Sequence, residues 1–124
     1  MRKRVLIADD EENVLKLISA TLGYDERYEI TLAHDGEEAL DIASRERPDL
    51  VILDMLMPKL DGPAVCRALK ADPSTAHVKV IFLTALTQES ERQKALRAGA
   101  DHFLTKPFSP TTLLLEVERM LNGD

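Results

Sequence analysis

The sequence predicts a doubly wound α/β domain, in which five helices cover both faces of a five-stranded parallel sheet. Apolar runs and amphipathic segments alternate five times along the chain, without a linker, a low-complexity tract or an internal repeat. Three of the runs, at residues 5–8, 50–53 and 80–83, are continuously apolar, as strands buried on both faces are. The 124 residues, 44% of them apolar, suffice for one core, and we expect one domain over residues 1–124.

The first third of the chain predicts a strand, a helix and an edge strand. The apolar run at residues 5–8 forms the first strand. Apolar residues at helical spacing follow, so we expect a helix that begins near Glu11 or Glu12 and ends at Gly23. Apolar and polar residues alternate at 28–32, which indicates one less buried face and therefore an edge strand.

The middle of the chain predicts a helix, the central strand and a further helix. Asp35 is a suitable N-cap for a second helix that ends before Pro48. The third strand follows at residues 50–54. Gly62 opens a third helix, which runs to about Lys70.

The last third predicts two more strands, each followed by a helix. Residues 78–84 form the fourth strand and residues 103–105 a short fifth strand. Between them lies a helix that Thr87 caps and that ends at Gly99. A helix with Pro110 as its first residue, after the N-cap Ser109, closes the chain.

The fourth helix is the most polar of the five. Between residues 88 and 98 it offers only Ala95, Leu96 and Ala98 for burial. We expect a weakly anchored helix that a modest free energy can displace. The alternative is an ordinary polar surface helix.

Right-handed crossovers with helices on both faces predict the strand order 2-1-3-4-5. In this order the connections leaving strands one and three go to opposite faces, which opens a crevice at the carboxyl ends of these strands. Asp9, Asp10 and Asp54 meet there, with Thr84 one strand further and Lys106 two strands further.

These side chains predict a magnesium-dependent phosphoryl acceptor. Three carboxylates repel one another unless a cation is present, and hard oxygen ligands favour Mg2+. We expect Asp10 to be a direct ligand, Asp9 to act through water, and Asp54 both to bind the ion and to attack phosphorus, forming an aspartyl phosphate. The ion and Lys106 neutralise the phosphoryl oxygens, and Thr84 donates a hydrogen bond to one of them.

Each of these residues alone has an ordinary structural explanation. Adjacent acids after a strand are often a solvated helix start favoured by the helix dipole, and an acid at the end of an apolar run is often a turn or a cap. Thr84 alone fits a cap, and Lys106 alone fits a surface lysine. Their joint arrangement at successive strand ends is what favours the phosphoryl acceptor.

Composition limits the partners. The net charge of −6 and the lack of a basic stripe argue against direct nucleic-acid binding. No apolar stretch approaches the roughly 20 residues that span a bilayer, and only four apolar residues follow the basic start, too few for a signal peptide. We therefore expect a cytoplasmic protein without membrane contact. Cys66 is the only cysteine and we expect it to be an inert buried thiol.

Four stretches of the sequence resemble the response-regulator receiver domains of two-component signalling, and the resemblance covers residues 5–121. The stretches are Val-Leu-Ile-Ala-Asp-Asp-Glu at 5–11, Leu-Asp-Met-Leu-Met-Pro at 53–58 leading to Asp61-Gly62, Leu-Thr-Ala at 83–85, and Gly-Ala-Asp at 99–101 leading to Lys-Pro-Phe at 106–108. The resemblance implies a flavodoxin-like fold of the chemotaxis-regulator type and a phosphorylation-controlled switch that is not an enzyme, although it promotes its own phosphorylation and slow dephosphorylation.

The resemblance also implies roles for the site residues. Asp54 would accept a phosphoryl group from a sensor histidine kinase or a phosphotransfer protein. Asp9, Asp10, Asp54 and the backbone carbonyl of Leu56 would hold Mg2+. An output domain or a target protein would read the phosphorylation.

A second set of residues would carry the response. By the resemblance, Lys106 is the phosphate-binding amine, the Lys106-Pro107 bond is cis, and Thr84 is the switch hydroxyl. Phe103 matches the aromatic switch position, which Thr84 recruits on phosphorylation. The face formed by the fourth helix, the fifth strand and the fifth helix would then shift. The alternative for Phe103 is a packed edge-strand aromatic.

Two other function classes fit the residues less well. A haloacid-dehalogenase-type phosphatase needs an acid two residues after its nucleophile, where this chain has Leu56. A flavodoxin-type carrier needs a phosphate loop after strand one, where residues 9–12 are all acidic.

Winged-helix transcription regulators dimerise through a charge set that includes Asp and Arg where this chain has His102 and Glu116, so we do not expect that dimer.

Overall fold

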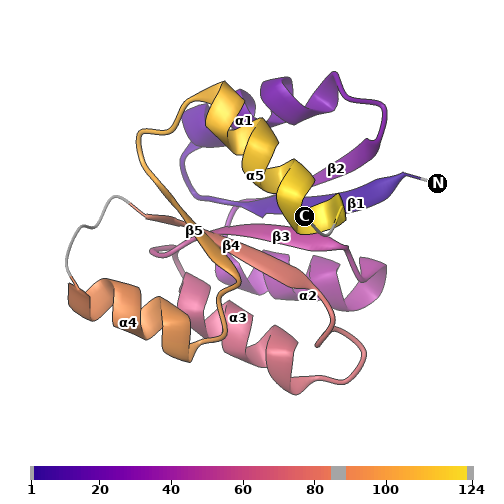
Figure 1. The fold of residues 1–124 in the computed structure, drawn as a ribbon. Helices are drawn as coiled ribbons and strands as arrows, with labels where there is room; N and C mark the ends of the chain where they lie inside the picture. Colours follow the sequence, from indigo (N-terminus) through magenta and orange to yellow (C-terminus); the bar gives the residue numbers. More distant parts are fainter. Residues whose placement is uncertain (1, 85–88, 123–124) are drawn as a thin grey trace.

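The computed structural model describes residues 2–84 and 89–122, and in this part of the chain five parallel strands form one sheet between two layers of helices (Figure 1). The strands are β1 (Lys3–Ala8), β2 (Tyr28–Ala33), β3 (Leu50–Asp54), β4 (Lys79–Thr84) and β5 (His102–Thr105). The helices are α1 (Glu12–Gly23), α2 (Gly36–Glu46), α3 (Gly62–Ala71), α4 (Glu89–Arg97) and α5 (Pro110–Asn122).

The strand order is β2-β1-β3-β4-β5, as predicted, with β2 at one edge. The register decides which residues meet beyond the strand ends. Ala8 pairs with Leu53, so Asp9 and Asp54 are the next residues on neighbouring strands. Thr84 pairs with Thr105, which places Lys106 directly beyond that pair.

The sheet separates two hydrophobic cores, because successive side chains of a strand point to opposite faces. Leu6, Val51, Leu53, Val80 and Phe82 pack under α2, α3 and α4. The intervening strand residues pack under α1 and α5, together with Leu15, Ile18, Leu22, Leu113 and Val117. Figure 1 shows the same division, with α1 and α5 on one face and α2, α3 and α4 on the other.

Helix starts follow the predicted capping chemistry. The Asp35 carboxylate accepts a hydrogen bond of 2.8 Å from the Glu38 backbone N–H, and Ser109 Oγ accepts one of 3.1 Å from Thr112. Asp61 caps α3 through the Ala64 N–H at 2.9 Å. Thr87, the predicted cap of α4, lies outside the described residues. The Lys106-Pro107 bond is cis, as predicted.

Helix α4 departs from the prediction at one residue. Ala95 and Ala98 are buried as expected, but the side chain of Leu96 is 47% exposed. The reason is helical geometry: residues three apart share a face, so Ala95 and Ala98 face the sheet while Leu96, one position on, points away. In the described part of the chain, no helix is both long enough and apolar enough to cross a membrane.

Candidate functional site

A cavity of about 350 Å³ opens at the carboxyl edge of the sheet, where the sequence predicted a crevice. Its described walls come from the ends of β3 and β4 and from the loops that follow β1, β3 and β5. The lining residues are Asp10, Glu11, Asp54, Met55, Leu56, Thr84 and Lys106. Five of the six predicted catalytic and metal-binding residues therefore line one cavity, and Asp9, which is fully buried, is the sixth.

Asp9 and Asp54 form the buried floor of the site. Asp9 follows β1 and is fully buried, while Asp54 ends β3 and is 8% exposed. Asp9 Oδ1 accepts a hydrogen bond of 2.9 Å from the Glu11 backbone N–H, which fixes one carboxylate oxygen. Two carboxylates held this close in a desolvated position need a cation nearby.

Lys106 supplies positive charge. Its Nζ lies 3.1 Å from Asp9 Oδ2, 3.2 Å from Glu11 Oε1 and 3.5 Å from Asp54 Oδ1. The Lys106 backbone N–H donates to the Thr84 carbonyl oxygen at 2.8 Å, so the end of β4 holds the residue that carries the amine. The sequence analysis placed Lys106 two strands beyond the acids at the same edge, and the structure brings its amine to Asp9 and Asp54.

The electrostatics of the site follow from this packing. Burial, and then the negative charge of Asp9, raise the pKa of Asp54 to about 6, although Lys106 acts in the opposite direction. For Lys106, burial acts to lower the pKa, but the hydrogen bond to Asp9 and the charges of Asp54 and Asp9 outweigh it and the pKa is raised. Asp54 is thus an easily protonated carboxylate that added positive charge would keep ionised.

Glu11 is the site residue that the sequence analysis did not identify. Among the described residues, the carboxylate oxygens of Asp9, Glu11 and Asp54 lie within 4.8 Å of one another. Asp10 is exposed and lines the cavity, but it is not part of this convergent group. The signal for Glu11 was its place in the acidic run after β1, which the prediction treated as a helix start.

The donor set fits a hard divalent cation. Three carboxylates offer oxygen ligands on one side of the cavity, and Asp10 and Leu56 lie on its wall. Mg2+ prefers such oxygens and keeps part of its water shell, which a cavity of this size admits. One ammonium against four acidic side chains leaves the site negative, so a dication would complete its charge balance.

Thr84 and Phe103 lie between the cavity and the side of the sheet that α4 covers. Thr84 lines the cavity at the end of β4. Phe103 on the neighbouring strand pairs with Phe82, two residues before Thr84. It is partly buried against the core under α4, and the Arg92 guanidinium of α4 lies 5.9 Å from the centre of its ring. That distance suits a cation–π contact, so α4 touches the aromatic residue of β5 directly.

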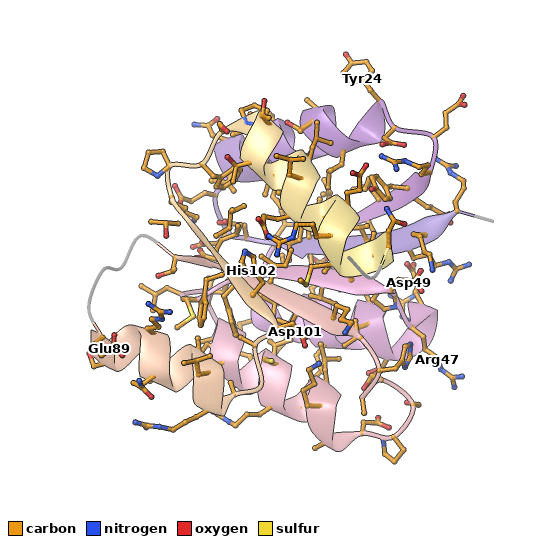
Figure 2. All side chains as sticks on the ribbon, viewed as in Figure 1. Tyr24, Arg47, Asp49, Glu89, Asp101 and His102 are labelled. Atoms are coloured by element: carbon orange, nitrogen blue, oxygen red, sulfur yellow. The ribbon has the colours of Figure 1, made fainter. Side chains whose placement is uncertain are left out.

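On the other side of β5, His102 faces α5 (Figure 2). His102 Nε2 lies 2.6 Å from Glu116 Oε2, and Glu116 also accepts a hydrogen bond of 3.1 Å from Arg119. His102 and Glu116, which stand where winged-helix regulators have the Asp and Arg of their dimer interface, thus pair with each other within the chain.

Residues 5–118 match the family described as the response regulator receiver domain. The chain belongs to this family. Receiver domains are signalling modules of two-component systems, and they generally bind Mg2+ at an acidic cluster of the kind found here. The aspartate cluster is compatible with phosphorylation and with Mg2+ binding.

Named relatives agree with this assignment. The response regulator PleD of Caulobacter vibrioides is 42% identical over 120 residues, which make up 97% of this chain and 26% of PleD. Two solved structures of similar fold are the Vibrio cholerae chemotaxis protein CheY4, with TM-score 0.91 and 33% identity over 98% of this chain and all of its own, and the receiver domain of a Pseudomonas aeruginosa PAO1 sensor histidine kinase.

The Pseudomonas structure holds a magnesium ion in its active-site cleft; it has TM-score 0.90 and 30% identity, and the match covers 98% of this chain and 99% of that one. The chain spans a quarter to a half of the length of the curated relatives it matches. Its resemblance to them is therefore a resemblance of receiver domains.

Proposed function

We propose that this receiver domain, residues 1–124, is a cytoplasmic switch that takes a phosphoryl group from a phosphohistidine onto Asp54. The observation that carries the proposal is the convergence of the buried Asp54 carboxylate with Asp9, Glu11 and Lys106 at an open cavity. The donor would be a sensor histidine kinase or a phosphotransfer protein, as the family implies.

The transfer requires a nucleophile and a leaving group. An oxygen of the Asp54 carboxylate attacks the phosphorus, and the bond between phosphorus and the donor imidazole nitrogen breaks. The electron pair stays on the imidazole, which is protonated by solvent. The product is an aspartyl phosphate, and Lys106 Nζ, now 3.5 Å from Asp54 Oδ1, is within reach of its oxygens.

Asp9, Asp10, Asp54 and the Leu56 backbone carbonyl are the residues we propose for Mg2+. When bound, the ion would neutralise charge on the phosphoryl oxygens. The presence of magnesium in the Pseudomonas receiver domain supports this assignment. Asp9, which is buried and already hydrogen-bonded, orients the site, and the exposed Asp10 completes it from the cavity wall.

The response would pass from Thr84 to Phe103. The Thr84 hydroxyl lines the cavity and would donate to a phosphoryl oxygen, and Phe103 would then turn inward. Because Arg92 lies over the Phe103 ring, that movement would reach α4 and the face that α4 shares with β5 and α5. An output domain or a separate target protein would read this face, so we propose that any contact with nucleic acid is indirect.

A phosphatase of the haloacid-dehalogenase type is less well supported. Leu56, two residues after Asp54, is 68% exposed at the cavity and cannot donate or accept a proton. The chain therefore lacks an acid at the position where such an enzyme protonates its leaving group, and slow self-dephosphorylation is the turnover we propose.

Substitution of the acceptor tests this proposal. Asp54→Asn should abolish labelling by acetyl phosphate or phosphoramidate with Mg2+ present, because an amide is neither a nucleophile nor an anionic ligand. Asp61→Asn is the matched control: Asp61 lies at the far end of the same loop and caps α3, which Asn can also do, so its labelling should equal that of the wild type. Wild-type labelling of Asp54→Asn would place the acceptor elsewhere.

A further inference from the structure

The loop between β3 and α3 rests on the first residue of α2 through a contact that only glycine permits. A β-carbon at Gly36 would lie 1.8 Å from the carbonyl oxygen of Leu60 and 2.6 Å from its carbonyl carbon. The Gly36 backbone N–H also donates to the Pro58 carbonyl oxygen at 3.4 Å. Helix α2 and this loop therefore meet backbone to backbone. A β-carbon at position 36 would collide with main-chain atoms, which cannot move aside as the end of a flexible side chain can.

The loop makes an uncommon turn at this contact. The Leu60 N–H donates to the Pro58 carbonyl oxygen at 2.7 Å, and Lys59 between them has φ of 71°. A residue with a β-carbon rarely adopts such a conformation, and it persists where the surroundings impose it. Lys59 Nζ lies 3.7 Å from Asp35 Oδ2, so the residue that caps α2 also attracts the turn.

The other end of the loop is held just as closely. A β-carbon at Gly62 would lie 2.2 Å from the Asp54 carbonyl oxygen, and the Gly62 N–H donates to the Met55 carbonyl oxygen at 3.1 Å. The loop is thus fixed where it leaves Asp54 and where it passes α2. Leu56 lies between these two points and lines the cavity.

We propose that Gly36 is a positioning residue for cation binding, because its contact with Leu60 sets where the Leu56 backbone carbonyl lies relative to Asp9 and Asp54. This inference rests on the proposed function, in which that carbonyl is a Mg2+ ligand. Mg2+ requires near-octahedral geometry at short distances, so it is sensitive to small displacements of one ligand. A methyl group at position 36 must push the Leu60 backbone away, and the displacement would reach Leu56 along four residues of chain.

Two alanine variants separate this role from a general effect of replacing glycine. Gly36→Ala should weaken Mg2+ binding about 10-fold or more, as loss of a supporting residue around a metal site does. Gly23→Ala is the control, because a β-carbon there meets no atom within 4 Å, and its Mg2+ affinity should match that of the wild type. The measurement is a Mg2+ titration of the unphosphorylated protein followed by backbone amide NMR, with the dispersion of the spectra reporting that each variant is folded.

A second pair of variants acts through the turn without crowding it. Asp35→Ser keeps an N-cap but removes the attraction for Lys59, and should weaken Mg2+ binding about threefold, the effect of one partly exposed ion pair. Glu37→Gln removes the same charge from an exposed side chain of the same helical turn, and serves as its control for long-range electrostatics.

The outcomes distinguish the two proposals. A wild-type protein that binds no Mg2+ overturns the proposed function and this inference with it. A folded Gly36→Ala protein with wild-type Mg2+ affinity overturns only the positioning role. If Gly36→Ala does not fold, equal Mg2+ affinities of Asp35→Ser and Glu37→Gln overturn the positioning role.

Discussion

Helices α3 and α4 cover the same face of the sheet, but they are attached to it in different ways. Helix α3 is capped by Asp61 and buries side chains along most of its length, among them Val65, Cys66 and Leu69. Of the side chains described in α4 and its end, only Ala95 and Ala98 are buried. Helix α3, which follows β3, is thus held firmly. Helix α4, which we propose carries the response, buries only two small side chains among those described.

Among the described residues, two polar contacts tie the segment just after α4 to α3. Cys66 Sγ donates to the Ala98 carbonyl oxygen at 3.1 Å, and burial raises the pKa of this thiol to about 11, which keeps it protonated. Lys70 Nζ lies 3.1 Å from Asp101 Oδ2, which also accepts a hydrogen bond of 2.8 Å from the Val80 N–H. Figure 2 shows Asp101 at this anchored end and Glu89 at the opposite end of α4.

The largest stability difference between the two helices should appear on truncating one leucine in each. Leu69→Ala in α3 removes a fully buried side chain and should lower the free energy of unfolding by about 2 to 5 kcal/mol. Leu96→Ala in α4 removes an exposed side chain and should change it by no more than about 0.5 kcal/mol. Urea denaturation measures both, and similar losses for the two variants would remove the distinction between a firmly and a lightly attached helix.

A smaller change in the free energy of unfolding is expected from removing the buried charge of Asp54. The pKa of Asp54 is about 6 in the folded protein and 3.8 is its ordinary value, so the folded state binds more protons between these pH values and the unfolding free energy falls as pH rises through them. Asp54→Asn carries no such charge. Without Mg2+ it should be more stable than the wild type by about 1 to 3 kcal/mol near pH 7.5, and the difference should shrink towards pH 4.

Denaturation with a chelator present, compared at these two pH values, tests the point. A difference that grows towards low pH would mean that Asp54 is stabilised as a carboxylate in the folded protein, which is the opposite of what its burial and its neighbour Asp9 predict.

The smallest of these effects concerns the lifetime of the aspartyl phosphate. Hydrolysis needs a water held behind the phosphorus, and the side chains two residues after Asp54 and two after Thr84 are best placed to hold it. They are Leu56, exposed at the cavity, and Leu86, which lies outside the described residues. Neither side chain can hydrogen-bond a water, so we predict that the aspartyl phosphate decays slowly compared with other receiver domains.

Replacing Leu56 with Asn and Leu86 with Glu should speed the decay about 10-fold or more, which corresponds to about 1.4 kcal/mol on the barrier. Decay of the label is followed after removal of the donor with Mg2+ retained, and Leu17→Asn, at an exposed leucine of α1, is the control. Loss of the label within seconds in the wild type, or a double variant no faster than the wild type, would contradict the prediction.

The sequence predicted the strand order, and it placed Asp9, Asp10 and Asp54 together at the carboxyl edge of the sheet, because both follow from local pattern and from the handedness of crossovers. Asp10 lines the cavity, but Glu11 takes its place in the convergent carboxylate group, since the strand pattern does not say which residue of an acidic run turns inward.

The sequence did not predict that Leu96 is exposed, because three apolar residues within four positions do not say which face the sheet selects. The contact of Gly36 with Leu60 was also beyond it. That contact joins segments 24 positions apart, and a glycine at a helix start has several ordinary explanations.

The central claim is that phosphorylation at a firmly held site displaces a lightly held helix through Thr84. Amide hydrogen exchange of α3 and α4, with and without acetyl phosphate and Mg2+, tests it most directly. We predict that α3 is the better protected helix in both states, that phosphorylation changes exchange in α4 and β5, and that Thr84→Ala is still labelled but loses this change. Equal protection of the two helices, or a wild-type response of α4 in phosphorylated Thr84→Ala, would contradict the claim.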